Sequence, residues 1–457
     1  MSRVLLVQAP LGRKEPPVLP LGLAWLASGL PADQPVAIYD PNVDERPVEE
    51  VIDTFRPDVV GVSLRNIDTT QYKDPYCFFS HFRPMVQRIR RKVGPETPIV
   101  VGGAGFSLFG EAVMRRVPEI HYGVHLEGEL TFARLLGALE PGGQPEAVPG
   151  VYRRVGEEVR FSGPGPRAVL TEHRPRLDLV DVKRYAPYAK NYAIGIQTKR
   201  GCVLACAYCT YVTLSGSQLR LRSPDEVVDE VEWYVREHNI TEVFFADTVF
   251  NLPPSHARAI VERLIERKVQ VRWRAYHNER TLDADYMRLA VESGCTEFTF
   301  SPDAWSQRSL TYLQKNVRQE DILRSLELVR ATPGACANYN FMIGLPGQDL
   351  RELAGMLRFY AYARRQLGRR LCGFRLAYVR VEPGTPLHVR LYGQADPAGL
   401  LPDGEQDLRR LFQTRTGDAL MDRFCTLTQV HLWPLSRRPL PQAGDERRGH
   451  LRGVFDV

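Results

Sequence analysis

Three cysteines crowd into one short segment near the middle of the chain. Residues Thr198–Tyr211 read TKRGCVLACAYCTY, which spaces Cys202, Cys206 and Cys209 as Cys-x-x-x-Cys-x-x-Cys. Thiolates at this spacing can hold a metal ion or a cluster in one compact loop. A [4Fe–4S] cluster normally takes four thiolates, so three would leave one iron with an open coordination site. Such an iron can chelate an amino-acid ligand through its amine and carboxylate groups.

A structural zinc ion is the alternative for the same loop. Zinc in structural sites takes four protein ligands, and no cysteine or histidine close in sequence supplies an obvious fourth. A distant cysteine such as Cys295 would have to complete the site. The other cysteines are scattered singly, so the chain does not have the pattern of a disulfide framework.

The composition is that of a globular protein with more than one domain. The chain has 457 residues, of which 44% are hydrophobic and 25% are charged, and this length suggests two or three domains. No run of about 18 apolar residues is present, and the first residues lack the pattern of a secretory signal. We therefore expect no membrane span and a cytoplasmic protein.

The net charge of +6 does not indicate a nucleic-acid partner. Basic residues are spread along the chain, with one modest cluster at Arg437–Arg452, and no basic run is interleaved with aromatic residues. Binding of nucleic acid is not expected.

The first 140 or so residues alternate apolar strand patterns with helical patterns. Leu21–Leu30 and Val48–Phe55 have helical patterns. Near-continuous apolar strands joined by helices form a parallel sheet that is covered on both faces. The segment therefore predicts an open, doubly wound α/β domain of Rossmann-like type. The predicted strands are Val4–Gln8, Val36–Asp40, Asp58–Leu64, Pro98–Val101 and His121–His125.

A second series of strand and helix patterns begins near Tyr192 and recurs about six times. This repetition is typical of a full or partial (βα) barrel, in which chemistry lies at the carboxyl ends of the strands. The predicted strands are Ala193–Thr198, Glu242–Ala246, Val271–Ala275, Glu297–Ser301, Tyr339–Ile343 and Gly373–Val381. The predicted helices are Pro224–Glu237, Pro254–Arg267, Ala284–Glu292, Gln319–Arg330 and Asp349–Leu367.

The sequence divides into four parts by these patterns. Residues 1–145 form the doubly wound domain, 146–190 a hairpin and linker, 191–390 a partial (βα)6 barrel, and 391–457 a short C-terminal extension. The extension is rich in Pro and Arg and contains one predicted helix near Glu405–Gln413.

The cysteine loop resembles the radical S-adenosylmethionine (SAM) superfamily. The resemblance lies in the cysteine spacing after a strand, in Gly201 before it and in the aromatic Tyr208 before the last cysteine. It implies that Cys202, Cys206 and Cys209 ligate a [4Fe–4S] cluster whose open iron binds SAM. It also implies reductive cleavage of SAM to a 5′-deoxyadenosyl radical, with electrons from a donor such as flavodoxin or ferredoxin.

Further positions fit the same superfamily. Asp247 ends the second barrel strand, where relatives place a polar group near the methionine amine, and Asp303 ends the fourth, close to the ribose. Gly344 and Pro346 lie in a Gly-Leu-Pro-Gly turn that resembles the turn beside the adenine. Ordinary turn or capping chemistry is the alternative for both aspartates.

A doubly wound domain before such a barrel resembles the cobalamin-dependent branch of the superfamily. Open α/β sheets bind ligands at the carboxyl ends of their strands, and glycines there let the backbone approach a bulky corrin ring. The resemblance implies cobalamin contacts from residues that follow strands two to five. These residues are Asn42, Val43, Ser63, Leu64, Arg65, Gly102, Gly103, Glu127, Gly128 and Glu129.

The chain lacks the Asp-x-His-x-x-Gly motif whose histidine ligates cobalt in classical cobalamin domains. The third strand instead ends in Ser63-Leu64-Arg65, so we expect Arg65 beneath the cobalt. A guanidinium does not deprotonate and would be a poor ligand, which would leave the cobalt underligated. A pair between Arg65 and Asp68, or a salt bridge between domains, is the alternative.

These features together predict a cobalamin-dependent radical SAM C-methyltransferase. It would move a methyl group from SAM, through methylcobalamin, to a carbon of a small-molecule or peptide substrate in specialised metabolism. A non-methylating enzyme with the same cofactors, which catalyses a cyclisation, ring contraction or rearrangement, is the first alternative. A cobalamin-binding regulatory module with a vestigial barrel is the second. A monomer is expected.

Overall fold

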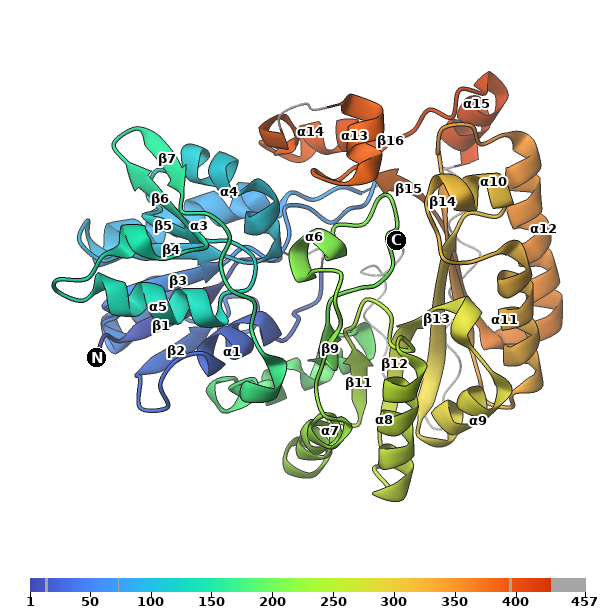
Figure 1. The fold of residues 1–457 in the computed structure, drawn as a ribbon, viewed down its shortest axis with the longest axis horizontal. Coiled ribbons are helices and arrows are strands. Elements are labelled where there is room, and N and C mark those ends of the chain that lie inside the picture. The colour runs from blue at the N-terminus through green and yellow to red at the C-terminus, as the bar shows by residue number, and fades with distance from the viewer. Residues whose placement is uncertain (13–14, 73, 394–396, 429–457) are drawn as a thin grey trace.

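The computed structural model describes the chain except for residues 13–14, 73, 394–396 and 429–457 (Figure 1). The described residues form two seven-stranded sheets and one two-stranded ribbon. The predicted basic cluster Arg437–Arg452 lies outside the described residues. No helix among the described residues is long and apolar enough to cross a membrane.

The first sheet has the strand order β2-β1-β3-β4-β5-β6-β7. Strands β1 to β5 pair in parallel, and β1 lies between β2 and β3. Its elements are β1 (Val4–Gln8), α1 (Leu21–Ser28), β2 (Val36–Tyr39), α2 (Val48–Phe55), β3 (Val59–Ser63), α3 (Phe78–Val93), β4 (Ile99–Gly102), α4 (Ala104–Arg116), β5 (Tyr122–Val124) and α5 (Glu129–Leu139).

The apolar runs form these strands because both faces of the sheet are covered. Leu5 and Val7 of β1 belong to one hydrophobic core with α2, α3 and α4, whereas Val4 and Leu6 belong to a second core with α1 and α5. Every residue of β1 is therefore buried, as expected for a parallel sheet between two helical layers. The predicted doubly wound fold is confirmed.

The hairpin β6 (Val151–Val155) and β7 (Glu158–Phe161) extends this first sheet. Strand β6 pairs antiparallel with β5, with Tyr122 opposite Arg153 and Val124 opposite Val151. The hairpin itself was predicted, and the structure shows that it packs with the first domain. From there, 3-10 turns at Leu170–Glu172, Leu177–Leu179 and Val182–Asn191 lead to the second sheet.

The second sheet has the order β16-β15-β14-β13-β12-β11-β8, and its first six strands in the chain pair in parallel. Figure 1 shows helices along its outer side. The strands are β8 (Gly195–Ile196), β11 (Glu242–Phe245), β12 (Arg272–His277), β13 (Cys295–Asp303), β14 (Ala337–Ile343) and β15 (Leu371–Arg380). The helices are α7 (Pro224–His238), α8 (Pro254–Glu266), α9 (Ala284–Glu292), α10 (Gln307–Tyr312), α11 (Gln319–Ala331) and α12 (Leu350–Leu367).

Alternation along the barrel strands separates an outer from an inner face. In β14, Ala337, Tyr339 and Phe341 are buried in the helical core, and the intervening residues are partly exposed. The period of two follows from strand geometry. The predicted six-unit partial barrel is confirmed. The five predicted helices differ from their predicted bounds by one residue at most at either end, whereas α10 was not predicted.

The C-terminal extension corrects one prediction. Residues 405–413 were expected to form one helix, but they form the short α14 (Glu405–Leu408), a 3-10 turn and the strand β16 (Phe412–Gln413). Strand β16 pairs antiparallel with β15, while Leu401, Leu408 and Leu411 pack in the core of the first sheet. The helix fails because these leucines must reach one domain while Phe412 completes the sheet of the other. Helix α13 (Pro386–Tyr392) leads into the extension, and α15 (Ala419–Thr428) follows β16.

A buried ion pair joins the two halves of the molecule. Arg380 at the end of β15 donates to Asp68 of the loop after β3, with Nη2 2.7 Å from Oδ2. The side chains are 5% and 3% exposed. Asp68 is therefore paired across the interface, which excludes the alternative pair with Arg65.

Candidate active site between the two sheets

The cysteine loop leaves the ribbon formed by β9 (Lys199–Arg200) and β10 (Arg220–Leu221). Gly201 has φ +90°, and a Cβ there would lie 2.0 Å from the Gln218 carbonyl oxygen, so only glycine fits this turn. The Cys202 backbone N–H donates to the Gly216 carbonyl at 3.0 Å. This bond closes the base of a loop that contains all three cysteines and the short helix α6 (Tyr211–Ser215).

The three thiols lie close enough for their charges to affect one another. Cys202 and Cys206 are buried and Cys209 is half-buried. Burial raises the pKa of Cys206, and it raises the pKa of Cys209 to about 11, with a further contribution from the neighbouring cysteines. The donor set fits a cluster, because each iron of a cluster takes its own thiolate.

The structure does not support the zinc alternative. Cys295 begins β13, and Asp303, which bonds to the cysteine loop, ends the same strand. Eight strand steps separate the two residues by about 26 Å, so Cys295 does not reach the loop. Within the described residues, no three His, Cys, Asp or Glu side chains converge on a site for one metal ion.

Asp303 connects the end of β13 to the cysteine loop. Its carboxylate accepts hydrogen bonds from the Tyr208 hydroxyl and from Lys315 Nζ, the latter at 2.7 Å. Lys315 also lies 3.4 Å from the Tyr208 hydroxyl. Burial alone would lower the pKa of Lys315, but the charge of Asp303 outweighs it and raises this pKa well above the usual value. Asp303 has φ +66°, so the strand end is held in the left-handed region.

Asp247 lies in a closed network beneath the same loop. Its carboxylate accepts from the Thr198 hydroxyl, the Thr198 N–H at 2.9 Å and Lys199 Nζ at 2.8 Å. The Asp247 side chain is fully buried. Asp247 thus connects the end of β11 to the strand that leads into the cysteines.

The turn after β14 is tight and contacts the C-terminal extension. Gly344 has φ +82°, and a Cβ there would lie 2.6 Å from the Tyr378 ring and 2.7 Å from the Gln413 carbonyl oxygen. The Gly347 N–H donates to the Thr416 carbonyl at 2.7 Å. Pro346 lies between these two glycines, so the extension holds the predicted adenine-side turn in place.

The carboxyl edge of the first sheet is made of close backbone contacts. A Cβ on Gly103 would lie 2.6 Å from the Leu64 carbonyl oxygen, and one on Gly105 would lie 2.9 Å from Asn66. These glycines let α4 begin directly against the loop after β3. Gly102 ends β4 beside Ser63, its partner in β3.

Asn42 fixes the neighbouring loop at the same edge. Its Oδ1 accepts from the Leu11 N–H at 2.8 Å, and its Nδ2 donates to the Ala9 carbonyl at 3.3 Å. Val43 follows it and accepts from Arg184 of the linker. The edge lies where the chain order reverses between β1 and β3, which is where open α/β sheets bind ligands.

Arg65 is exposed at the end of β3. It makes no side-chain hydrogen bond or ion pair within the part of the chain that the structure describes. Its charge acts on Glu15, whose pKa is raised by burial and partly lowered by Arg65. It also acts on Tyr211, which is 48% exposed, and there the charge of Arg65 opposes the rise that Cys209 causes in the pKa of the hydroxyl. Arg65 and the cysteine loop therefore lie within electrostatic reach of each other.

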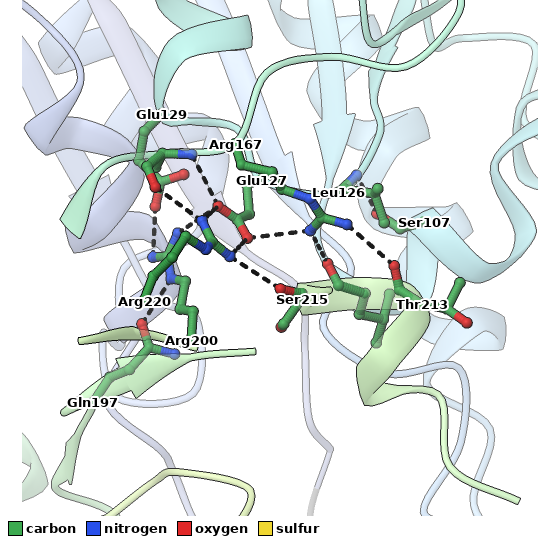
Figure 2. A network of polar contacts seen from close by, with 12 residues as sticks. Ser107, Leu126, Glu127, Glu129, Arg167, Gln197, Arg200, Thr213, Ser215 and Arg220 are labelled. Carbon is green, nitrogen blue, oxygen red and sulfur yellow. Dashed lines mark hydrogen bonds and ion pairs between the residues drawn. The ribbon is translucent and has the colours of Figure 1, made fainter. Parts of the chain in front are cut away.

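Glu127 and Glu129 follow the carboxyl end of β5, and their carboxylates are paired. Figure 2 shows them in a network of arginines from the linker and from the β9–β10 ribbon. Gly128 between them packs against Leu26 of α1, where a Cβ would lie 2.6 Å from Leu26 Cδ1. These three residues, which the sequence assigned to the cobalamin site, lie at the contact between the two domains.

Sequence reasoning missed the lysines. Lys199 and Lys315 pair with the two aspartates that end β11 and β13, and both lysines are buried. Lysines are rarely buried unless they are paired. Their scarcity in this arginine-rich chain was the one available signal, but it named no partner.

Two family models match the chain. Residues 196–360 match the radical SAM superfamily, and residues 14–136 match the B12 binding domain. The chain therefore contains a radical SAM domain and, before it, a B12-binding domain. The radical SAM domain implies a [4Fe–4S] cluster and SAM, and the B12-binding domain implies cobalamin.

The relatives are methyltransferases and cyclases. An uncharacterised methyltransferase of Pyrococcus horikoshii is 26% identical over 345 residues, which are 74% of this chain and 72% of the relative. The anaerobic magnesium-protoporphyrin IX monomethyl ester cyclase of Synechocystis is 26% identical over 239 residues, which are 52% of this chain and 48% of the relative.

A solved structure has the same fold. The radical SAM methyltransferase TsrM of Kitasatospora setae, with cobalamin and a [4Fe–4S] cluster bound, matches with a TM-score of 0.72. The match has 23% identity and covers 85% of this chain and 74% of TsrM.

Proposed function

We propose that this chain is a cobalamin-dependent radical SAM C-methyltransferase. The observation that carries the proposal is the approach of the two edges. Helix α6 of the cysteine loop contacts helix α4, which begins at the carboxyl edge of the first sheet. Tyr211, two residues after Cys209, also lies close enough to Arg65 at the end of β3 for the charge of Arg65 to act on its pKa. One substrate between the sheets could therefore reach both cofactor sites.

The chain's own residues hold and orient the reacting groups in this proposal. Cys202, Cys206 and Cys209 ligate the cluster and leave one iron for SAM, and the turn at Gly344 and Pro346 and the carboxylate of Asp303 face SAM. When bound, the cluster and SAM supply hydrogen abstraction and cobalamin supplies methyl transfer. Asn42, Val43, Ser63, Leu64, Arg65, Gly102 and Gly103 line the corrin side.

Carbon is the favoured methyl acceptor for a chemical reason. A nucleophilic nitrogen or oxygen can take a methyl group from SAM directly and needs neither a radical cluster nor cobalamin. A chain that carries both domains is suited to an acceptor carbon that lacks such reactivity. The acceptor is a small molecule or peptide, and the proposal includes a flavodoxin- or ferredoxin-type electron donor, a monomeric enzyme and a cytoplasmic location.

A non-methylating cyclase is the second candidate, because one matched relative is a cyclase. Anaerobic reconstitution with iron, sulfide and hydroxocobalamin tests the cofactors first, and about one cobalt and four irons per chain are expected. Incubation with SAM labelled in its methyl group then separates the candidates. Label on cobalamin supports the methyltransferase, whereas 5′-deoxyadenosine without label on cobalamin supports the cyclase. Iron without cobalt would overturn both.

A further inference from the structure

Two arginines lie directly opposite each other at the base of the cysteine loop. Arg200 of β9 pairs with Arg220 of β10 in the antiparallel ribbon. Like charges opposite each other destabilise a strand pair, and the Arg200 side chain is only 9% exposed. The ribbon that carries the three cysteines therefore needs negative charge from elsewhere in the molecule.

The B12-binding domain supplies that charge. Arg220 Nη1 lies 2.6 Å from Glu127 Oε2, and its Nη2 also donates to Glu127 Oε1. Arg200 lies 3.4 Å from Glu127 and 2.6 Å from Glu129. Burial alone would raise the pKa of Glu127, but the hydrogen bond from Arg220 and the charges of both arginines outweigh it and lower this pKa.

The same carboxylate reaches the other end of the cysteine loop. Arg167 of the linker lies 3.1 Å from Glu127 Oε1 and donates to the carbonyls of Thr213 and Leu214 at the end of α6. Arg220 donates to the Ser215 carbonyl at 3.0 Å. Carbonyls at a helix end lack partners within the helix, so these arginines complete α6 (Figure 2).

Both ends of the loop thus meet at one side chain of the other domain. Arg200 lies two residues before Cys202, and α6 begins two residues after Cys209. Glu127 lies just before α5 of the first sheet, and its Oε2 also accepts from the Ala168 N–H at 3.0 Å. The Glu127 carboxylate contacts three arginines, and each of these contacts or precedes the cysteine loop.

We propose that Glu127 is a positioning residue that fixes the cluster loop against the B12-binding domain and thereby sets the separation of the two cofactors. This role rests on the proposed function, and it replaces the cobalamin contact that the sequence suggested for Glu127. Glu129 has a lesser part, because among the described residues its carboxylate forms an ion pair with Arg200 and with no second arginine.

The test compares Glu127→Gln with Glu158→Gln, which removes the charge of an exposed pair with Arg160 in the same domain. Hydrogen exchange of residues 200–216 is measured first in the chain without cofactors. The Glu127→Gln variant is expected to exchange at least about tenfold faster there, and Glu158→Gln is expected to match the wild type. Arg167→Met, at a partly exposed side chain, gives an intermediate increase and replaces Glu127→Gln if that variant does not fold.

The loaded enzyme gives the second readout. Iron and cobalt contents are expected to stay at wild-type levels in Glu127→Gln, while pulsed EPR shows a broader distance distribution between the cobalt(II) and cluster spins. Unchanged exchange and an unchanged distance distribution would overturn the proposal. Loss of cobalt with unchanged exchange would also overturn it and restore the cobalamin contact. If the wild type itself retains no cobalt, the proposed function fails, and exchange still tests the connection between the domains.

Discussion

The two edges that face each other in this molecule are built in different ways. On the barrel side, Asp247 and Asp303 end their strands fully or almost fully buried, and each is paired with a lysine. On the side of the first sheet, Arg65 is exposed, and glycines pack backbone against backbone. The barrel edge fixes charges in pairs, whereas the sheet edge presents main chain and one exposed cation, Arg65.

This difference indicates that the two edges have different roles, one in orienting reacting groups and the other in binding a large ligand. A buried, paired carboxylate keeps its position because moving it would leave a charge without a partner in low dielectric. An edge of backbone and glycine can approach a large flat ligand closely, since it has few side chains to displace. The barrel edge is thus suited to orient reacting atoms, and the sheet edge is suited to hold a bulky carrier.

Replacing the three cysteines of the loop should have the largest effect on the barrel side, because it removes the ligands of the cluster. Each of Cys202→Ala, Cys206→Ala and Cys209→Ala is expected to lower reconstituted iron from about four per chain to below about one. All cleavage of SAM should be lost with it. Iron analysis and EPR of the reduced protein check this result.

Cys295→Ala is the matched control, because Cys295 is a buried thiol at the other end of β13. It is expected to keep its iron. Loss of iron in this variant would instead indicate a site that Cys295 completes, contrary to the geometry.

Breaking the ion pair between Asp68 and Arg380, which joins the two domains, should have the next largest effect, a loss of folding stability. Asp68→Asn leaves Arg380 buried with the more distant carboxylate of Glu382, 3.7 Å away. A buried charge that loses its partner costs about 3–5 kcal/mol, and because Glu382 remains, we expect a cost near the lower end, about 3 kcal/mol. Removing the exposed pair in Glu158→Gln should cost less than about 1 kcal/mol. Thermal and denaturant unfolding of both variants measure the difference, and equal costs would show that the buried pair contributes little to joining the domains.

Glu279 is a buried carboxyl group on the barrel side whose titration should make the stability of the protein depend on pH. It follows β12, is 1% exposed, and burial raises its pKa to about 7, although Lys315 lowers it in part. The folded state then keeps a proton that the unfolded state loses above its pKa near 4.5. Stability should therefore fall as pH rises from about 4.5 to about 7, by about 3 kcal/mol.

Glu279→Gln removes this titration while it keeps the shape of the side chain. The variant should gain stability relative to the wild type as pH rises through this window, and denaturant unfolding at pH 5 and pH 8 measures the gain. A constant difference between the two proteins would mean that Glu279 is ionised in the fold at both pH values.

The sequence predicted the barrel side far better than the sheet side, for a physical reason. Cysteine spacing, Gly201 and the strand periodicities are local patterns, and local geometry makes each of them necessary. Glu127 and Glu129 follow a strand in the sequence, but the arginines that pair with their carboxylates lie 40 to 93 positions later in the chain. The sequence pattern of one domain does not indicate which of its charged residues form ion pairs with the other domain.

The prediction of one helix at residues 405–413 of the C-terminal extension was wrong for a similar reason. Its leucines and Phe412 have a pattern that allows a helix, but they pack against two different sheets. The buried partners Lys199, Lys315 and Arg380 were missed likewise, because the need for a counter-ion becomes visible only once burial is known.

Arg65 gives the smallest effect on stability and the sharpest test of the sheet side. Because it is exposed and forms no hydrogen bond within the described residues, Arg65→Ala should change the free energy of unfolding by less than about 0.5 kcal/mol. EPR of the cobalt(II) form should show no nitrogen splitting from the protein in the wild type, since a guanidinium does not ligate cobalt. Arg65→His offers an imidazole at the same position and should introduce that splitting. Nitrogen splitting already present in the wild type would place a different residue beneath the cobalt, and the sheet edge would then hold the cobalamin by ligation of the cobalt rather than beside an exposed cation.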